Sequence, residues 1–313
     1  MKPTSDSAYS GRLTLKMAIN LAAPHTWPAA IMPMLLAACF ATRTGSLSVT
    51  TTVVLLVIVV LMQSAVNTFN DYYDYVKGSD SADDNVDPSD AVLVYNDINP
   101  KAALKLAIGF LAGAFVLGIY AIVRAGFTPL IIALIGALFV VLYSAGKSPI
   151  SYLPLGEVVS GFVMGGLIPL AGYQVLTNEL DFSILLLSIP TIIGVGIIMF
   201  TNNTCDIERD IPSGRKTLPI LLGRDRARLV YRILVIVWVV DIIVNVAVCF
   251  TAGLVVIPFM LLASYPLLKA LLSNPLTQER RLQAMPQALS VNVVLGAFYA
   301  AAILMSTSVV LVL

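Results

Sequence analysis

The chain has 313 residues, of which 58% are hydrophobic and 12% are charged, and its formal net charge is +1. The charged fraction is about half that of an average soluble domain, which excludes an ordinary soluble protein and predicts a polytopic membrane protein. The near-zero net charge gives no general attraction to nucleic acid, so we expect no nucleic-acid partner.

The N-terminus and the cysteines narrow the expected architecture further. The first fifteen residues hold no apolar run and no small-residue cleavage site, so we expect no removable signal peptide. Cys39, Cys205 and Cys249 are too few for a disulfide framework and lack the spacing of a metal site. The predicted fold class is all-α: residues 1–313 form a single transmembrane helical bundle around a central cavity, without a soluble appendage.

Apolar runs near the roughly 20 residues that cross a hydrocarbon core predict nine membrane segments. Tight turns near Gly126 and Gly253 separate neighbouring runs that are too long, when combined, for one crossing. The nine segments span residues 19–41, 49–69, 102–123, 127–145, 155–177, 182–201, 229–249, 252–272 and 288–312.

Lysine and arginine predict the orientation, because loops rich in these residues stay in the cytoplasm. With nine crossings and a cytoplasmic N-terminus, only Arg43 and Arg124 fall on the outer side, and the C-terminus lies outside. We therefore expect a multi-pass protein of the cytoplasmic (inner) cell membrane. Both acid-rich stretches described next would then lie on its cytoplasmic face.

The first acid-rich stretch follows the second predicted segment. Asp71 and Asp74 are three residues apart and share a helical face, with Asn67 and Asn70 on the same side. Carboxylates are costly near lipid and mark a functional site by default. Such an oxygen-rich patch suits magnesium, whereas zinc would require histidine or cysteine.

The second acid-rich stretch follows the sixth predicted segment. Asp206 and Asp210 are four residues apart on one helical face, directly after Asn202 and Asn203. Glu208 points elsewhere and is expected to be solvated. Two carboxylate pairs that face one another across a cavity suit a diphosphate bridged by Mg²⁺. The candidate metal ligands are Asp71, Asp74, Asp80, Asp206 and Asp210.

Basic residues near these stretches divide into two groups. Lys216, in a compact basic turn, is assigned to the phosphates, together with Lys77. Arg224, Arg226, Arg228 and Arg232 are interpreted as orientation signals only.

These motifs resemble those of the intramembrane (UbiA-type) aromatic prenyltransferases. The family's signatures Asn-Asp-x-x-Asp and Asp-x-x-x-Asp are matched at residues 70–74 and 206–210. Residues 67–72, 77–80, 202–207, 214–223 and 143–157 are similar to the branch that acts on 1,4-dihydroxy-2-naphthoate. Three features depart from the pattern: Gly78 replaces a common third Asp, Cys205 replaces a commonly basic residue, and residues 83–99 are acidic.

The resemblance implies Mg²⁺-dependent transfer of a polyprenyl group from its diphosphate to the naphthoate, with loss of CO₂ and diphosphate, giving demethylmenaquinone. A dry bundle within the lipid bilayer would protect an allylic cation from water. The resemblance implies catalytic roles for Asp71, Asp74, Asp206 and Asp210. It implies substrate-binding roles for Asn67, Asn70, Tyr72, Lys77, Tyr143, Asn202, Asn203 and Lys216.

Several alternatives remain open at this point. 4-Hydroxybenzoate and homogentisate are alternative acceptors. A secondary transporter would also hold carboxylates in the membrane, but usually near the middle of broken helices. His25, the only histidine, is interpreted as interfacial, and Asp241 has no assigned role. Tail length and oligomeric state do not follow from the sequence.

Overall fold

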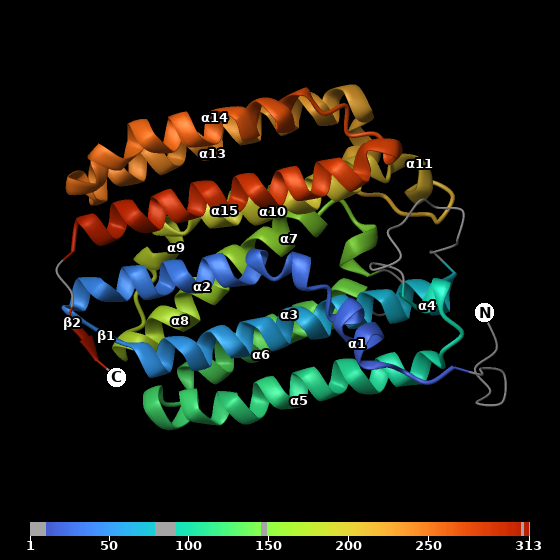
Figure 1. Cartoon of the computed structure of the whole chain (residues 1–313), viewed down its shortest axis with the longest axis horizontal. Coiled ribbons are helices and arrows are strands. Elements are labelled where there is room, and N and C mark those ends of the chain that lie inside the picture. The colour runs from blue at the N-terminus through green and yellow to red at the C-terminus, as the bar shows by residue number, and fades with distance from the viewer. Residues whose placement is uncertain (1–10, 79–91, 145–148, 308–309, 313) are drawn as a thin grey trace.

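Long, roughly parallel helices make up most of the computed structural model, which describes residues 11–78, 92–144, 149–307 and 310–312 (Figure 1). The helices are α1 (Leu15–Ala22), α2 (Pro28–Ala41), α3 (Val49–Lys77), α4 (Val92–Tyr95), α5 (Pro100–Ala125), α6 (Thr128–Ser144), α7 (Gly156–Phe162), α8 (Ile168–Thr177), α9 (Ser183–Leu187), α10 (Ile189–Cys205), α11 (Ile207–Asp210), α12 (Leu218–Leu222), α13 (Arg224–Cys249), α14 (Ile257–Ser273) and α15 (Arg281–Met305). A π-helical stretch, Val163–Leu167, joins α7 to α8. Two short strands, β1 (Ser46–Ser48) and β2 (Val310–Val312), pair in parallel.

The number of apolar helices agrees with the prediction. In the part of the chain that the structure describes, six helices are long and apolar enough to cross a membrane, and three shorter apolar helices accompany them. The turns also lie where they were expected. Gly126 adopts φ 73° and ends α5, and a 3₁₀ turn at Thr251–Val256 separates α13 from α14.

The first predicted segment differs from the prediction, because the helix is broken between α1 and α2. Ala23 has a left-handed φ of 47°. Pro24 and Pro28 flank the break and have no amide hydrogen for a continuous helix. The Trp27 indole N–H donates to the Ala22 carbonyl oxygen at 3.0 Å, which stabilises the turn. The residues of this turn lie beside α3, where they reach the candidate site.

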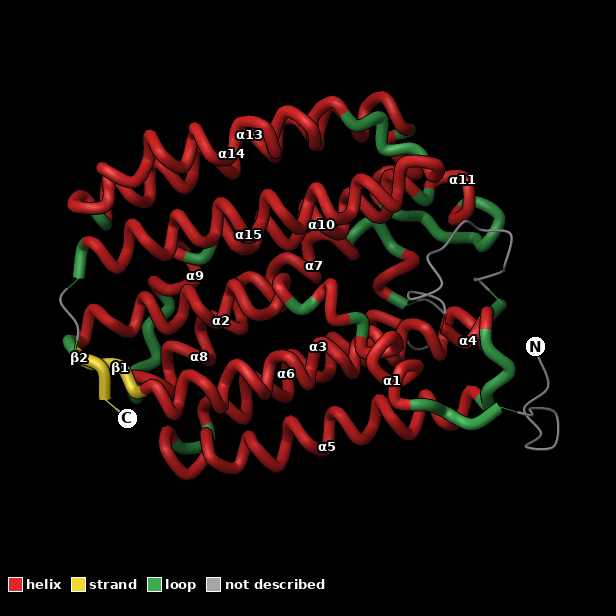
Figure 2. Tube along the Cα trace, in the orientation of Figure 1, coloured by secondary structure: helices red, strands yellow, loops and turns green. Residues whose placement is uncertain are grey.

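Short elements gather at the two ends of the bundle (Figures 1 and 2). At one end lie α1, α4 and α11, together with the last turns of α3. At the other end lie α9, β1 and β2. The helix α3 runs on to Lys77, beyond the predicted end at residue 69, so it carries the first acid cluster as an extension of a membrane-spanning helix.

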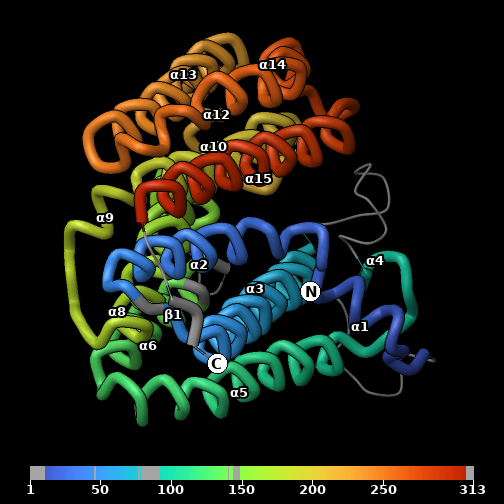
Figure 3. Tube along the Cα trace, turned by 60° about the vertical axis from the view of Figure 1, so that its left-hand side comes forward, coloured from blue at the N-terminus to red at the C-terminus, as the bar shows by residue number. Residues whose placement is uncertain are grey.

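The bundle has two sides with different packing (Figure 3). The helices α13 and α14 cover α10 and α15 on one side, and α3, α5 and α6 lie on the other. The main core joins α2, α8, α10, α13 and α15, with the rings of Phe40, Phe250 and Tyr299 in mutual contact. Close approach between the π-helical stretch and α10 depends on glycine: a Cβ atom at Gly165 would lie 2.5 Å from the Ile192 nitrogen.

Candidate functional site

The two acid clusters meet through one arginine. Arg215 Nη2 lies 3.1 Å from Asp74 Oδ1, and its Nη1 lies 3.5 Å from Asp210 Oδ1. All three side chains are buried. The fold therefore brings the end of α3 and the segment after α10 to one place.

In the first cluster, the asparagines are fixed by their amide groups. Asn70 Nδ2 donates to Asp74 Oδ2 at 3.1 Å. Asn67 Nδ2 donates to the Ala22 carbonyl oxygen at 3.0 Å and to Thr26 Oγ1 at 2.8 Å. The broken turn between α1 and α2 thus sets the orientation of Asn67.

Asp71 has a second task that the sequence pattern does not predict. Its carboxylate accepts the backbone N–H groups of Val92, at 2.7 Å, and Leu93, at 3.3 Å. These are orphan donors at the start of α4, which have no partner within the helix. Asp71 therefore anchors α4 against the end of α3.

The second cluster is held by arginines from different parts of the chain. Arg281 Nε lies 3.1 Å from Asp206 Oδ1, and its Nη2 donates to Asn202 Oδ1 at 2.8 Å. Arg209 Nη1 lies 3.9 Å from Asp206. Burial raises the pKa of Asp210 to about 6, although neighbouring Arg215 opposes the shift.

These residues line a polar cavity of about 280 Å³. Its cations are Arg209, Arg215 and Arg281, and Tyr143 and His25 also contribute to its wall. Of the predicted site residues, the cavity is lined by Asn67, Asn70, Asp71, Asp74, Tyr143, Asn202, Asn203 and Asp206. Asp210 lies behind the wall, in contact with Arg215.

Other predicted residues lie elsewhere. The Lys216 side chain is exposed, and its backbone N–H donates to the Tyr152 carbonyl oxygen at 2.8 Å. Residues 215–217 form neither helix nor strand, and their burial alternates: Arg215 and Thr217 are buried whereas Lys216 is exposed, so Arg215 enters the site instead. Tyr72 packs edge-on against Tyr73, outside the cavity lining. Asp80 and the side chain of Lys77 lie outside the described residues.

Glu208 is exposed, as expected, and it pairs with Arg224, which was interpreted as an orientation signal only. Arg224 Nη2 donates to both carboxylate oxygens of Glu208, at 2.7 and 2.6 Å. Its Nη1 donates to the carbonyl oxygens of Thr204 and Leu276. Because Arg224 is the first residue of α13, these contacts tie the start of α13 to α11, to the end of α10 and to the loop between α14 and α15, in addition to any role in orientation.

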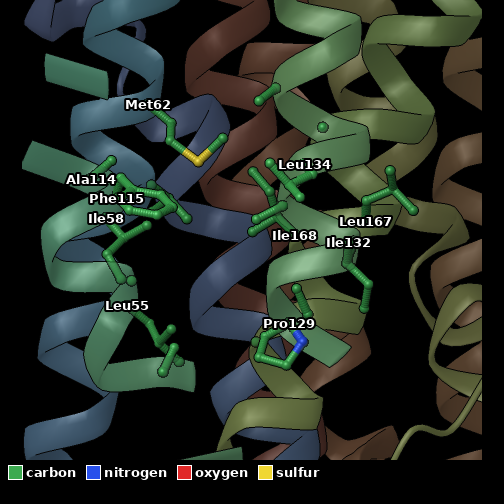
Figure 4. A pocket seen from close by; sticks show the side chains of 18 of the residues that line it. Leu55, Ile58, Met62, Ala114, Phe115, Pro129, Ile132, Leu134, Leu167 and Ile168 are labelled. Carbon is green, nitrogen blue, oxygen red and sulfur yellow. The ribbon is translucent and has the colours of Figure 1, made fainter. Parts of the chain in front are cut away.

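An apolar chamber of about 490 Å³ adjoins the polar cavity. Side chains from α3, α5, α6 and α8 line it, among them Leu55, Phe115 and Ile168 (Figure 4). Gln63, Val66, Val163 and Met164 line both spaces and so form the neck between them. An elongated molecule with a charged head and a hydrocarbon tail matches this pair of spaces.

The donor set is suited to a hard divalent cation that shares its coordination with a ligand. Among the described residues, no group of three His, Cys, Asp or Glu side chains is close enough to hold a metal ion alone. Magnesium takes one or two protein carboxylates and completes its shell with water and phosphate oxygens, so carboxylate pairs are sufficient. Both carboxylate oxygens of Asp210 are buried without a hydrogen-bond partner in the described part of the chain, which leaves acceptor capacity at this position.

Comparisons with known proteins agree with this architecture. The model of the UbiA prenyltransferase family matches residues 30–292. The 1,4-dihydroxy-2-naphthoate octaprenyltransferase of Bacillus subtilis (strain 168) is 35% identical over 208 residues, which cover 66% of this chain and 66% of that protein. The enzyme of the same name from Haemophilus influenzae is 29% identical over 180 residues, covering 56% of this chain and 58% of that protein. The matched parts thus span 66% and 58% of the length of these two relatives, less than two thirds in each.

Solved structures share the fold at low sequence identity. The structure of a UbiA homolog from Archaeoglobus fulgidus bound to DMAPP and Mg²⁺ superposes with a TM-score of 0.66 and 18% identity, covering 92% of this chain and 99% of that chain. A UbiA homolog from Aeropyrum pernix K1 gives a TM-score of 0.58 and 16% identity, covering 93% of this chain and 98% of that chain.

Proposed function

Because the chain belongs to the UbiA prenyltransferase family, we propose that it transfers a polyprenyl group from polyprenyl diphosphate to 1,4-dihydroxy-2-naphthoate, releasing CO₂ and diphosphate. The product would be demethylmenaquinone, in menaquinone biosynthesis. The observation that carries this proposal is that the two acid clusters meet at one polar cavity, and that a neck joins this cavity to the apolar chamber.

The polar cavity would receive the diphosphate. Asp71, Asp74, Asp206 and Asp210 would hold Mg²⁺, with Asp80 as a further ligand predicted from the sequence. The cation would supply charge neutralisation for the departing diphosphate. Arg215 and Arg281 already lie among these carboxylates, so they orient the acids and add positive charge for the phosphates. Lys77 and Lys216 remain phosphate-binding predictions from the sequence.

The apolar chamber would receive the isoprenoid tail. A buried CH₂ group contributes about 0.8 kcal/mol, so a long tail gains substantial binding energy from a chamber lined by aliphatic side chains. The same lining excludes water from the neck. An allylic cation that forms there would meet the aromatic ring before a water molecule.

The naphthoate is proposed as acceptor because two of the similar enzymes carry that activity in their names. Tyr143 offers an aromatic face to the acceptor and to developing positive charge.

The protein is a multi-pass membrane protein. We place it in the cytoplasmic membrane with the N-terminus and site inside and the C-terminus outside, because α1 and β2 lie at opposite ends and the basic loops favour that orientation (Figure 1).

The test is product formation by the purified protein in detergent, with Mg²⁺, a polyprenyl diphosphate and one of two acceptors, followed by mass spectrometry. We expect a demethylmenaquinone-type product from 1,4-dihydroxy-2-naphthoate. Product from 4-hydroxybenzoate alone would retain the reaction class and reject the proposed acceptor. No Mg²⁺-dependent transfer to either compound would contradict the proposal.

A further inference from the structure

Glu157 is a buried acid that the diphosphate chemistry does not use. It lies in the first turn of α7, is 4% exposed and does not line the polar cavity. Its Oε1 accepts a hydrogen bond from Asn203 Nδ2 at 2.8 Å, and its Oε2 has no hydrogen-bond partner among the residues that the structure describes. Burying a carboxylate is costly, so its position calls for a role.

The contact between Glu157 and Asn203 is fixed by the packing of their helices. A Cβ atom at Gly161 would lie 2.6 Å from the Ile192 carbonyl oxygen, so α7 and α10 approach backbone to backbone. The Gly196 Cα lies opposite the same stretch of α7. This rigid pair brings the Glu157 carboxylate to the rear of Asn203, away from the cavity.

A carboxyl oxygen that accepts a hydrogen bond selects the orientation of the neighbouring amide, because only the NH₂ group of the amide can donate to it. The Asn203 NH₂ group must face Glu157. Asn203 lines the polar cavity, so its amide oxygen is the polar atom left for the cavity. With a neutral partner in place of Glu157, the amide would be free to present its NH₂ group instead.

Asn203 lies at the depth where the acceptor must bind. It precedes Asp206 by three residues, which is about 4.5 Å along a helix, on the side away from the acid end. When the carboxylates hold the diphosphate, the reacting carbon of the attached prenyl group lies deeper in the bundle than the carboxylates. Tyr143 and Met199 line the same cavity and contact one another through the Tyr143 hydroxyl group and the Met199 sulfur at 3.1 Å, which gives an aromatic and thioether wall suited to a flat ring.

We propose that Glu157 is a positioning residue that turns the Asn203 amide oxygen towards the acceptor, where it accepts a hydrogen bond from a ring hydroxyl group. This inference rests on the proposed prenyl transfer to a hydroxylated aromatic acceptor. A hydrogen bond of this kind orients the ring and increases the electron density at the carbon that attacks. Glu157 thereby contributes to acceptor recognition without touching either substrate.

The test measures KM for each substrate separately in Glu157→Gln, Asn203→Ala and the double variant. For Glu157→Gln we expect KM for the hydroxylated acceptor to rise on the order of tenfold, the effect of losing one hydrogen bond, while KM for the prenyl diphosphate stays within about twofold. In the Asn203→Ala background, Glu157→Gln should have no further effect on acceptor KM. Glu179→Gln, an exposed acid at the opposite end of the bundle, is the charge-matched control.

Three results would overturn the inference. They are an equal rise in KM for the prenyl diphosphate, a Glu157→Gln effect that persists in Asn203→Ala, and an unchanged acceptor KM in Glu157→Gln.

If Glu157→Gln does not accumulate, inhibition by an acceptor whose hydroxyl groups are methylated provides an independent test. The wild-type protein should bind that ether on the order of tenfold more weakly than the hydroxylated acceptor, and Asn203→Ala should bind both equally. Discrimination retained by Asn203→Ala would reject the contact, whereas absence of transfer by the wild-type protein would reject the proposed function itself.

Discussion

The acid end of the bundle and the apolar chamber are built by opposite means. At the acid end, a few charged side chains contact one another at defined distances; they come from α3, from α11 and the residue before it, from α15 and from the loop before α12. The chamber is a wall of interchangeable aliphatic groups from several helices (Figure 4). A hydrogen bond or an ion pair is lost when one of its atoms is removed, whereas the stabilisation from apolar contacts decreases in proportion to the buried area that is lost. The effects of substitutions on activity should therefore differ between the two regions in size and in kind.

The largest effect is expected for Asp206→Asn, at the acid end. The substitution preserves shape but removes the charge that faces Arg281 and that would hold Mg²⁺. Transfer should fall on the order of 1,000-fold, measured as product per minute at saturating substrate. Glu208→Gln is the matched control, because this acid lies two residues away and pairs with Arg224 at the surface; its rate should stay within about twofold. An active Asp206→Asn variant would contradict the assignment.

The next effect tests the link between the clusters. Arg215→Met removes the only cation that the structure places between Asp74 and Asp210 in the described chain. The two buried carboxylates would then repel one another, and the diphosphate would lose a positive partner. We expect kcat/KM for the prenyl diphosphate to fall about 100-fold, against a loss below about threefold for Lys216→Met, because that side chain is exposed. Equal losses in both variants would favour the phosphate role predicted for Lys216.

A smaller, graded effect is expected in the chamber. Ala114 lies on its wall and is 6% exposed, so Ala114→Phe should fill part of the space (Figure 4). Loss of two buried CH₂ groups at about 0.8 kcal/mol each corresponds to roughly a tenfold rise in KM for a long-chain diphosphate. A five-carbon substrate should be unaffected. Val123→Phe, on an exposed face of the same helix, is the control. An equal effect on both chain lengths would place the tail elsewhere.

The smallest effect near neutral pH is acid inhibition. Burial raises the pKa of Asp210 to about 6, so this carboxyl is ionised at neutral pH and becomes protonated as the pH falls below that value. A protonated carboxyl no longer attracts Mg²⁺. Transfer should halve near the pKa and then decline about tenfold per pH unit, and added Mg²⁺ should shift the midpoint downwards because the ion competes with the proton. A rate that stays constant from pH 7 to pH 5 would exclude this role for Asp210.

The features that followed from the sequence are those with local signals. Apolar runs of spanning length predicted nine apolar helices, six of which are long enough to cross a membrane in the described chain, and the paired acids at Asp71 and Asp206 marked the end of the bundle where the clusters meet. These patterns lie within single helices, where spacing determines the shared face.

The features that did not follow depend on contacts between distant segments. Arg281 reaches Asp206 because α15 begins seven residues earlier than the apolar run suggested, and no local pattern pairs the two. The sequence does not distinguish Arg215 from its neighbour Lys216, because which of the two side chains enters the site depends on the backbone hydrogen bonds that Arg215 makes to Asp210 and Lys216 makes to Tyr152. The cap that Asp71 provides to α4 is likewise a tertiary contact. Each of these contacts would have required knowledge of the helix packing.

The length of α3 has a consequence for substrate supply. Its 29 residues extend about 43 Å, whereas the hydrocarbon core is about 30 Å thick, so the turns that carry Asn70 to Asp74 reach the level of the lipid headgroups. A polyprenyl diphosphate dissolved in the leaflet holds its own phosphates at that same level. Under the proposed function, the substrate would enter by lateral diffusion in the membrane plane, without lifting its tail into water.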